Sequence, residues 1–135
     1  MKKYLILVAL VFSQSLALTA CGAGGPSTNS SVDVVEFTFT PADFTVPAGQ
    51  EITLELRNNG AVVHDFIIMN LGTQVGQDFD KEDEPNVYWK AELGPGTSGT
   101  FTFTAPSQPG EYQVVCGTPG HYIAGMVARL NVVAE

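Results

Sequence analysis

The chain of 135 residues is poor in cysteine, in basic side chains and in long apolar runs. Its two cysteines are too few for a disulfide-dense scaffold, although they could form a single bridge. The 14 acidic residues outnumber the 6 basic residues, for a formal net charge of -8, and this argues against a nucleic-acid binder, which needs a basic face. The apolar content of 44% is enough for a packed core, so the composition predicts one domain, with or without a processed segment.

The N-terminus has the pattern of a secretory signal peptide. Two lysines precede an apolar run at 4–12, which is too short to remain in a bilayer as a spanning helix. The sequence Leu-Thr-Ala-Cys at 18–21 resembles the bacterial lipobox, in which the cysteine is lipidated and becomes the mature N-terminus. We therefore predict a lipoprotein signal peptide at 1–20 and a lipid on Cys21. An ordinary cleavable signal is the alternative.

Lipidation of Cys21 would leave Cys116 without a disulfide partner. The lipidated cysteine and the small polar residues after it would form a flexible tether at 21–31, with a reach of roughly 17 Å, ahead of a folded domain at 32–135. Loss of the signal peptide removes two lysines and leaves 4 basic and 14 acidic groups, a net charge of -10. We expect a monomer that is lipid-anchored at the extracytoplasmic face of the cell membrane.

From residue 31 onward the apolar residues follow a period of two, which predicts β-strands. Strict alternation at 50–57 places Ile52, Leu54 and Leu56 on one face. No segment has helical periodicity over three turns, and glycine, proline and asparagine separate the apolar segments. The sequence predicts an all-β fold, a Greek-key antiparallel β-sandwich of about 7–8 strands. The expected strands are 32–40, 50–57, 62–69, 87–93, 100–104, 111–116 and 126–133.

Residues 78–84 contain five acidic side chains and one lysine. The simpler interpretation is a solvated loop, because runs of charge usually stay in water. The alternative is a docking surface for a basic partner.

The residues with distinctive chemistry lie mostly near the C-terminus. Cys116, His121 and Met126 have Cys-x4-His-x4-Met spacing, and His64 lies on an earlier predicted strand that a sandwich could bring to the same end. Two imidazoles, a thiolate and a weak thioether are the ligand set of a blue-copper electron-transfer site, whereas zinc has no use for a methionine. Taken singly, each residue is more simply explained as part of the core. Their combination favours one copper ion.

Residues 32–134 resemble a cupredoxin, most closely of the auracyanin type; azurin and plastocyanin use related loops of other spacing. The resemblance rests on the loop at 116–126 and on Gly-Glu-Tyr-Gln-Val-Val-Cys at 110–116, which is similar to the strand before that family's copper cysteine. It implies that one type 1 copper, as Cu(I) or Cu(II), is held by His64, Cys116, His121 and Met126. It also implies that the His121 ring edge lies at the surface as the electron route. An apolar docking rim is expected from Pro119, Gly120, Tyr122, Ile123 and Ala124.

One residue departs from azurin and plastocyanin, which have asparagine directly after the first ligand histidine. This chain has Asp65 there. We expect its carboxylate to accept hydrogen bonds from the Gly117–Thr118 backbone or from the Thr118 hydroxyl, so that both side chains support the site from outside the ligand set. Its negative charge should favour Cu(II) and lower the reduction potential.

Four protein ligands leave no open position on the metal, and the sequence offers no nucleophilic triad or phosphate-binding glycine loop, so we do not expect an enzyme. The predicted function is one-electron transfer by a membrane-tethered type 1 copper protein that shuttles between redox partners, with a basic docking face on the partner. A copper chaperone or storage lipoprotein is the main alternative. A sandwich that binds no metal is a third.

Overall fold

The computed structural model describes residues 25–134, which form nine β-strands and one short 3-10 helix. The predicted signal peptide at 1–20 and the predicted lipid anchor at Cys21 lie outside the described residues. The 3-10 helix η1 (Glu84–Asn86) precedes β6. The strands are β1 (Asn29–Val35), β2 (Thr38–Thr40), β3 (Asp43–Pro47), β4 (Glu51–Asn58), β5 (His64–Met69), β6 (Val87–Leu93), β7 (Ser98–Thr104), β8 (Gly110–Val115) and β9 (Val127–Val133).

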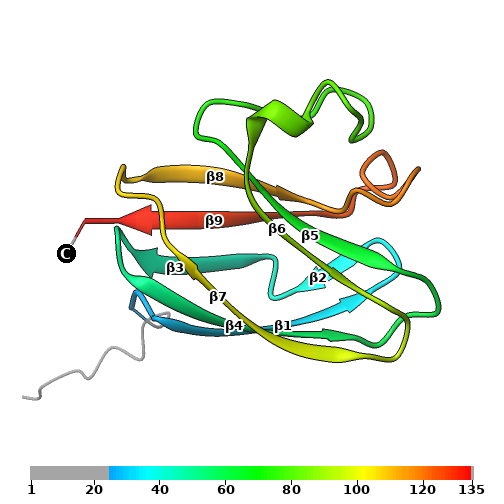
Figure 1. Ribbon diagram of the computed structural model, residues 1–135, viewed down its shortest axis with the longest axis horizontal. Coiled ribbons are helices and arrows are strands. Elements are labelled where there is room, and N and C mark those ends of the chain that lie inside the picture. Colours follow the sequence, from blue (N-terminus) through cyan, green and yellow to red (C-terminus); the bar gives the residue numbers. More distant parts are fainter. Residues whose placement is uncertain (1–24, 135) are drawn as a thin grey trace, which may run out of the picture.

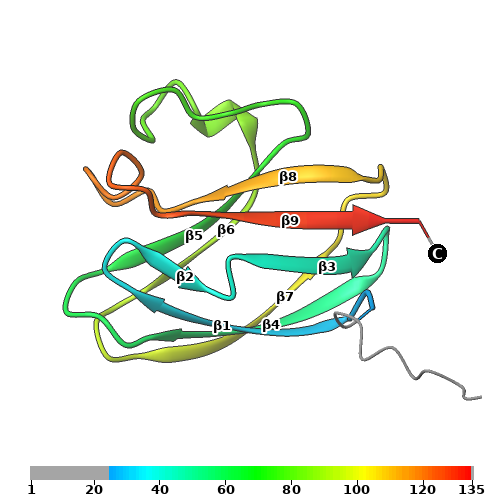
Figure 2. The same cartoon turned by 180° about the vertical axis from the view of Figure 1, so that it is seen from behind.

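The strands form two sheets that pack face to face (Figures 1 and 2). One sheet has the order β2-β1-β4-β7, and the other has the order β3-β9-β8-β5-β6. The predicted all-β sandwich is therefore confirmed. The sheets are mixed, because β1 pairs with β4, and β3 with β9, in parallel. The prediction of antiparallel pairing was wrong for these two pairs, since parallel neighbours are joined through long crossovers that local periodicity does not reveal.

Alternating side chains build the core between the sheets. Along β4 every second residue is buried, and Ile52, Leu54 and Leu56 are at most 1% exposed. β5 lies between β8 and β6 and is buried at nearly every position. Each fully buried aliphatic side chain contributes about 1.5–3 kcal/mol relative to an exposed one. The interior strand β5 is therefore a firm support for the residue that begins it, His64.

The structure differs from the predicted strands near the N-terminus. β1 begins at Asn29, which pairs with Thr53, so the end of the predicted tether belongs to the sheet. The single strand expected at 32–40 is a hairpin that turns at Glu36 and Phe37. Phe37 has a φ of 67°, a left-handed conformation that is unusual for a bulky residue. Nothing in the sequence marks this turn, because no glycine or asparagine stands there.

β3 was not predicted, because the proline that ends it and the proline shortly before it weaken the strand pattern. Tertiary pairing with β9 supplies its hydrogen bonds. Within the part of the chain that the structure describes, there is no helix of the length and apolarity that a bilayer crossing requires.

Candidate metal centre

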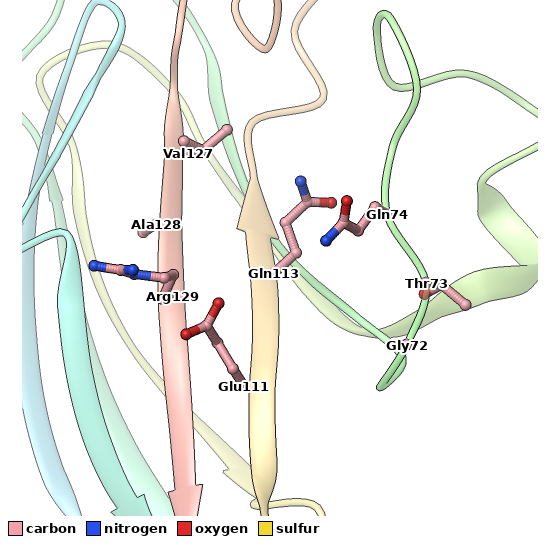
Figure 3. Close-up of a pocket in the computed structure, with 8 residues that line it drawn as sticks. All are labelled: Gly72, Thr73, Gln74, Glu111, Gln113, Val127, Ala128 and Arg129. Atoms are coloured by element: carbon pink, nitrogen blue, oxygen red, sulfur yellow. The ribbon is translucent and has the colours of Figure 1, made fainter.

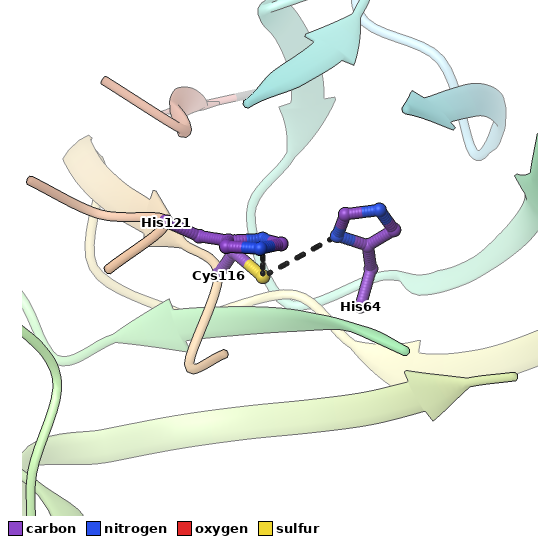
Figure 4. A group of neighbouring side chains, drawn as sticks. All are labelled: His64, Cys116 and His121. Atoms are coloured by element: carbon purple, nitrogen blue, oxygen red, sulfur yellow. Dashed lines mark hydrogen bonds between the residues drawn. The ribbon is translucent and has the colours of Figure 1, made fainter. Parts of the chain in front are cut away.

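Two histidines and a cysteine meet at one end of the sandwich (Figure 4). His64 is the first residue of β5, and Cys116 directly follows the last residue of β8. β5 and β8 are neighbours in one sheet, so strand pairing brings these two side chains together. His121 joins them from the loop between β8 and β9.

The distances among the three side chains suit one metal ion. Cys116 Sγ lies 3.8 Å from His64 Nδ1 and 3.6 Å from His121 Nδ1. A metal with bonds of about 2.3 Å to sulfur and about 2.0 Å to nitrogen, at trigonal angles, separates sulfur from nitrogen by about 3.7 Å. The residues therefore fit a metal that takes one thiolate and two imidazoles, with little rearrangement.

The three side chains are buried: Cys116 is 0%, His64 1% and His121 8% exposed. Burial lowers the pKa of the His64 imidazole, and the neighbouring His121 lowers it further, while Glu36 acts in the opposite direction. A lowered pKa keeps the imidazole neutral, which is the form that binds metal. Cys116 is a free cysteine, so its sulfur is available as a ligand.

Met126 closes the loop that carries Cys116 and His121. Its side chain is fully buried, and its N–H donates to the His121 carbonyl at 3.0 Å. Its own carbonyl accepts the N–H of Cys116 at 3.3 Å. The loop therefore begins and ends side by side, as a compact unit that holds Cys116, His121 and Met126 together.

The loop before His64 is held by Asn58, which is 1% exposed. Its amide group donates to the carbonyls of Val62 at 2.8 Å and Leu93 at 3.0 Å. Its side-chain oxygen accepts the N–H of Gly60 at 2.9 Å. A buried amide whose hydrogen bonds are satisfied stabilises one conformation of a loop. No local sequence pattern marks Asn58 for this role.

Asp65 and Thr118 both contact the ligand segments, but not each other as expected. The Asp65 N–H points to Cys116 Sγ at 3.5 Å. The Thr118 hydroxyl donates to the Val63 carbonyl at 2.8 Å rather than to the Asp65 carboxylate. The segments that carry His64 and Cys116 are therefore linked, as expected. The link runs from the Thr118 side chain to the Val63 backbone, and residue identities alone do not reveal such a contact.

The Asp65 carboxylate lies close to the backbone after Cys116. A Cβ added at Gly117 would be 2.9 Å from Asp65 Oδ2, so glycine permits this approach. Burial raises the pKa of Asp65, and the carboxylate of Glu92, opposite it on β6, raises it further. The carboxylate is therefore a partly desolvated negative charge beside the metal centre.

The surface over His121 differs from the expected rim. Ile123 is 71% exposed, as predicted for a rim residue. Tyr122 instead points inward, where its hydroxyl donates to the Val75 carbonyl at 2.8 Å. The 48% exposed ring of Phe37 stands edge-on to His121 with centroids 5.2 Å apart. Phe37 reaches this position only because of the hairpin turn, so the sequence analysis missed it.

The acidic segment at 78–84 is attached to the ligand loop. Asp78 Oδ2 accepts the N–H of Gly120 at 2.7 Å. Further along, the N–H of Asp80 donates to the Asp83 carboxylate at 3.0 Å, and Lys90 pairs with Glu84 at 3.0 Å. Part of the acidic charge therefore serves the loop's own structure, and the remainder faces solvent.

A separate hollow of about 260 Å³ lies beside β8 and β9 (Figure 3). Its lining includes the polar side chains of Gln74, Glu111, Gln113 and Arg129, and none of the metal-donor residues. We find no second group of metal donors within residues 25–134. The site at His64, Cys116 and His121 is therefore where the chemistry of this protein is concentrated.

Known proteins are similar to this chain in sequence and in fold. Residues 4–128 match the family described as cupredoxin-like domain. Auracyanin-B of Chloroflexus aurantiacus is 33% identical over 110 residues, which cover 70% of this chain and 46% of that protein. Auracyanin-A of the same organism is 29% identical over 147 residues, covering 87% of this chain and 90% of that protein. The chain thus spans less than half of one auracyanin and most of the other.

The structure of dithionite-reduced auracyanin from Roseiflexus castenholzii superposes with a TM-score of 0.69 at 34% identity, covering 81% of this chain and 99% of that one. The copper-resistant cuproprotein CopI of Pseudomonas aeruginosa is 28% identical over 143 residues, covering 76% of this chain and 75% of that protein. The donor set and the family match agree on the metal. The chain belongs to the cupredoxin family, and the cofactor of its buried site is one copper ion.

Proposed function

We propose that this protein carries single electrons, with its copper cycling between Cu(I) and Cu(II) at His64, Cys116, His121 and Met126. The convergence of the first three donors, all within 4.8 Å of one another, carries the proposal. Soft sulfur ligands stabilise Cu(I), and imidazole also suits Cu(II). A preformed site of this kind needs little reorganisation when an electron arrives or leaves.

A carrier is favoured over an enzyme because the site lacks room for a substrate. Cys116, His64 and Met126 are at most 1% exposed, and His121 is 8% exposed. Four protein ligands would complete the coordination, so no substrate reaches the metal directly. The similarity to the auracyanins also supports a carrier rather than an enzyme. The electron would then enter and leave through the part of the protein surface that is nearest the copper.

The proposed electron route runs through His121. The exposed ring of Phe37 contacts it, and Ile123 is exposed two residues further along the ligand loop. Val62 and Val63 are exposed directly before His64, and we take these four apolar side chains as the contact surface. Small surfaces of this kind suit brief encounters between redox proteins rather than lasting complexes. The residual exposure of His121 supports this route over one through the sandwich.

The carrier is tested by adding Cu(II) to the copper-free protein and recording its visible spectrum and voltammogram. We expect an intense blue thiolate-to-copper band and a reversible one-electron wave. A colourless protein, or a wave that is irreversible because the metal is lost, would contradict the proposal.

A copper chaperone or storage protein is the second candidate, and the similarity to CopI gives it weight. The buried donors favour the carrier, because a protein that hands over copper needs an exchangeable site. Incubation of the copper-loaded protein with a strong chelator separates the two. Retention for hours supports the carrier, whereas release within seconds supports a transfer role.

We also propose a lipid at Cys21 that holds the carrier at the extracytoplasmic membrane face. The lipobox-like sequence at 18–21 supports this. Expression of the full chain in a bacterium, with labelled fatty acid, tests it. Label and membrane association should both disappear in Cys21→Ser, and a wild-type chain without label would refute the anchor.

The partner is proposed to have a basic docking face, because the chain is acidic overall and Asp80 and Glu82 are exposed beside the ligand loop. A cationic inorganic oxidant should therefore react several-fold faster at low salt than at high salt. Neutralising both residues, as Asp80→Asn and Glu82→Gln, should reduce this salt dependence. If the dependence of the rate on salt is unchanged, the acidic segment at 78–84 is not part of the docking surface.

Replacing Asp65 with asparagine is expected to raise the reduction potential. The variant removes a partly buried negative charge that favours Cu(II), and one unit charge at about 8 Å contributes about 0.5–2 kcal/mol between effective dielectric constants of about 80 and about 20. The shift is then on the order of tens of millivolts. Voltammetry measures the shift, and Glu111→Gln, at an exposed position on β8, is the control that should leave the potential unchanged. No upward shift in Asp65→Asn would contradict this prediction.

A further inference from the structure

The hairpin turn between β1 and β2 lies against both histidines of the copper site. Phe37 contacts His121, as described above. The preceding residue, Glu36, directs its carboxylate toward His64, with Oε1 3.9 Å from Nε2. The β1–β2 turn therefore contributes to the metal centre, although it is far from the ligand motif in the sequence.

The outer nitrogen of His64 needs a hydrogen-bond acceptor. Nδ1 faces Cys116 Sγ at 3.8 Å, so Nε2 is directed away from the metal position. Among the described residues, His64 Nε2 is a buried side-chain polar atom without a hydrogen-bond partner. A neutral imidazole that binds metal through Nδ1 carries its proton on Nε2. A buried N–H of this kind costs about 1–3 kcal/mol when it has no acceptor.

Glu36 is well placed to be that acceptor. Its carboxylate is anchored, because Oε1 accepts the N–H of Ala61 at 2.5 Å. A partly exposed glutamate that accepts a backbone N–H is ionised at neutral pH, so the anchored group is a carboxylate. The side chain is 39% exposed, so a small rotation of the carboxylate about this anchor can close the roughly 1 Å that separates 3.9 Å from a hydrogen bond.

The local packing leaves space for this contact. A Cβ added at Gly60 would lie 2.7 Å from Glu36 Oε1 and 2.9 Å from His64 Nε2. The missing side chain at Gly60 therefore opens the gap in which the carboxylate and the imidazole meet. This observation is independent of the distance between them.

We propose that Glu36 is a positioning residue that accepts a hydrogen bond from His64 Nε2–H when copper is bound. The contact orients the imidazole and makes it a stronger donor to the metal, as carboxylates do for metal-bound histidines generally. The negative charge also favours Cu(II) over Cu(I). The inference rests on copper at this site and is independent of the tether and the redox partner.

The decisive measurement is the ¹H–¹⁵N NMR signal of His64 Nε2–H in the protein loaded with Cu(I), and separately with Zn(II). In the wild type we expect a downfield, slowly exchanging proton. Glu36→Leu removes the acceptor and should speed exchange at least tenfold, while the corresponding proton of His121 stays unchanged. The zinc-loaded protein tests the contact without any electron transfer. If the copper-loaded wild type has no blue band or no reversible redox wave, the proposed function is refuted, but this contact is not.

Two further variants distinguish charge from hydrogen bonding. Glu36→Gln keeps an oxygen acceptor but removes the charge, so the proton should stay protected while the reduction potential rises. Gly60→Ala keeps the charge but crowds the contact, so exchange should speed up as in Glu36→Leu. Cu(II) affinity, measured by chelator competition, should fall roughly 10–100-fold in Glu36→Leu.

Glu111→Gln is the matched control, because it removes the same charge from an exposed position on β8 without contact with either histidine. It should leave proton exchange and copper affinity as in the wild type. If Glu36→Leu behaves as Glu111→Gln does in both measurements, the proposed role of Glu36 is overturned. A folded, metal-loaded Glu36→Gln with an unchanged potential would overturn the electrostatic part.

Discussion

Replacing Cys116 with serine is expected to abolish essentially all of the blue absorption of the copper-loaded protein. The band requires charge transfer from a thiolate to Cu(II), and a serine hydroxyl is neither ionised at neutral pH nor soft. The variant also loses the ligand that most stabilises Cu(I). Cys116 is 0% exposed, and the cavity around it changes little because the two side chains are nearly isosteric.

The measurement is a titration with Cu(II), followed by visible absorption and electron paramagnetic resonance. We expect the variant to remain folded and to bind Cu(II) weakly, with the spectrum of an ordinary nitrogen and oxygen site. Cys21→Ser is the matched control, as it changes the other cysteine of the chain and should keep the blue band. A blue Cys116→Ser protein would refute the assigned ligand and the carrier with it.

Truncating Phe66 to alanine is expected to cause the largest loss of folding stability. Phe66 is 1% exposed and lies two residues after His64 on β5. Its ring contacts Phe39, Phe44 and Trp89, with centroids 5.4, 5.7 and 6.5 Å away. Removal of such a side chain costs about 3–5 kcal/mol, a large share of the about 5–15 kcal/mol that holds a domain folded.

Urea unfolding of the copper-free protein measures this loss without the contribution of metal binding to the native state. Ile123→Ala is the control, because this side chain is 71% exposed and its truncation should change stability by no more than about 0.5 kcal/mol. Equal unfolding midpoints for Phe66→Ala and the wild type would show that the aromatic contacts of Phe66 do not stabilise the fold.

The fold class was predictable because its signal is local. Alternation along β4 assigns Ile52, Leu54 and Leu56 to one face, and the structure buries all three. The hairpin at Glu36 and Phe37 has no comparable signal, since the left-handed φ of Phe37 contradicts the preference of its residue type. The strand β3 was missed for another reason: two prolines weaken its local pattern, and the partner that stabilises it, β9, is more than eighty residues away.

The convergence of His64, Cys116 and His121 was also predictable, since three ligand types occur within eleven residues and the chain has only two histidines. The contacts around the donors were less predictable from the sequence. The Asp65 carboxylate was expected to accept from the Gly117–Thr118 backbone or from the Thr118 hydroxyl, and that hydroxyl instead donates to the Val63 carbonyl. Tyr122 was expected on the surface, and it bonds the Val75 carbonyl inside.

The sequence alone determined the chemistry of the site, because the identities of His64, Cys116, His121 and Met126 specify which metal they hold in any fold that unites them. Only the tertiary structure decided what surrounds that metal. Glu36 and Phe37 reach the histidines because a turn with no sequence signal folds over the end of the sandwich. Ligand identity is a property of side chains, whereas their surroundings depend on backbone paths and packing between segments distant in the chain.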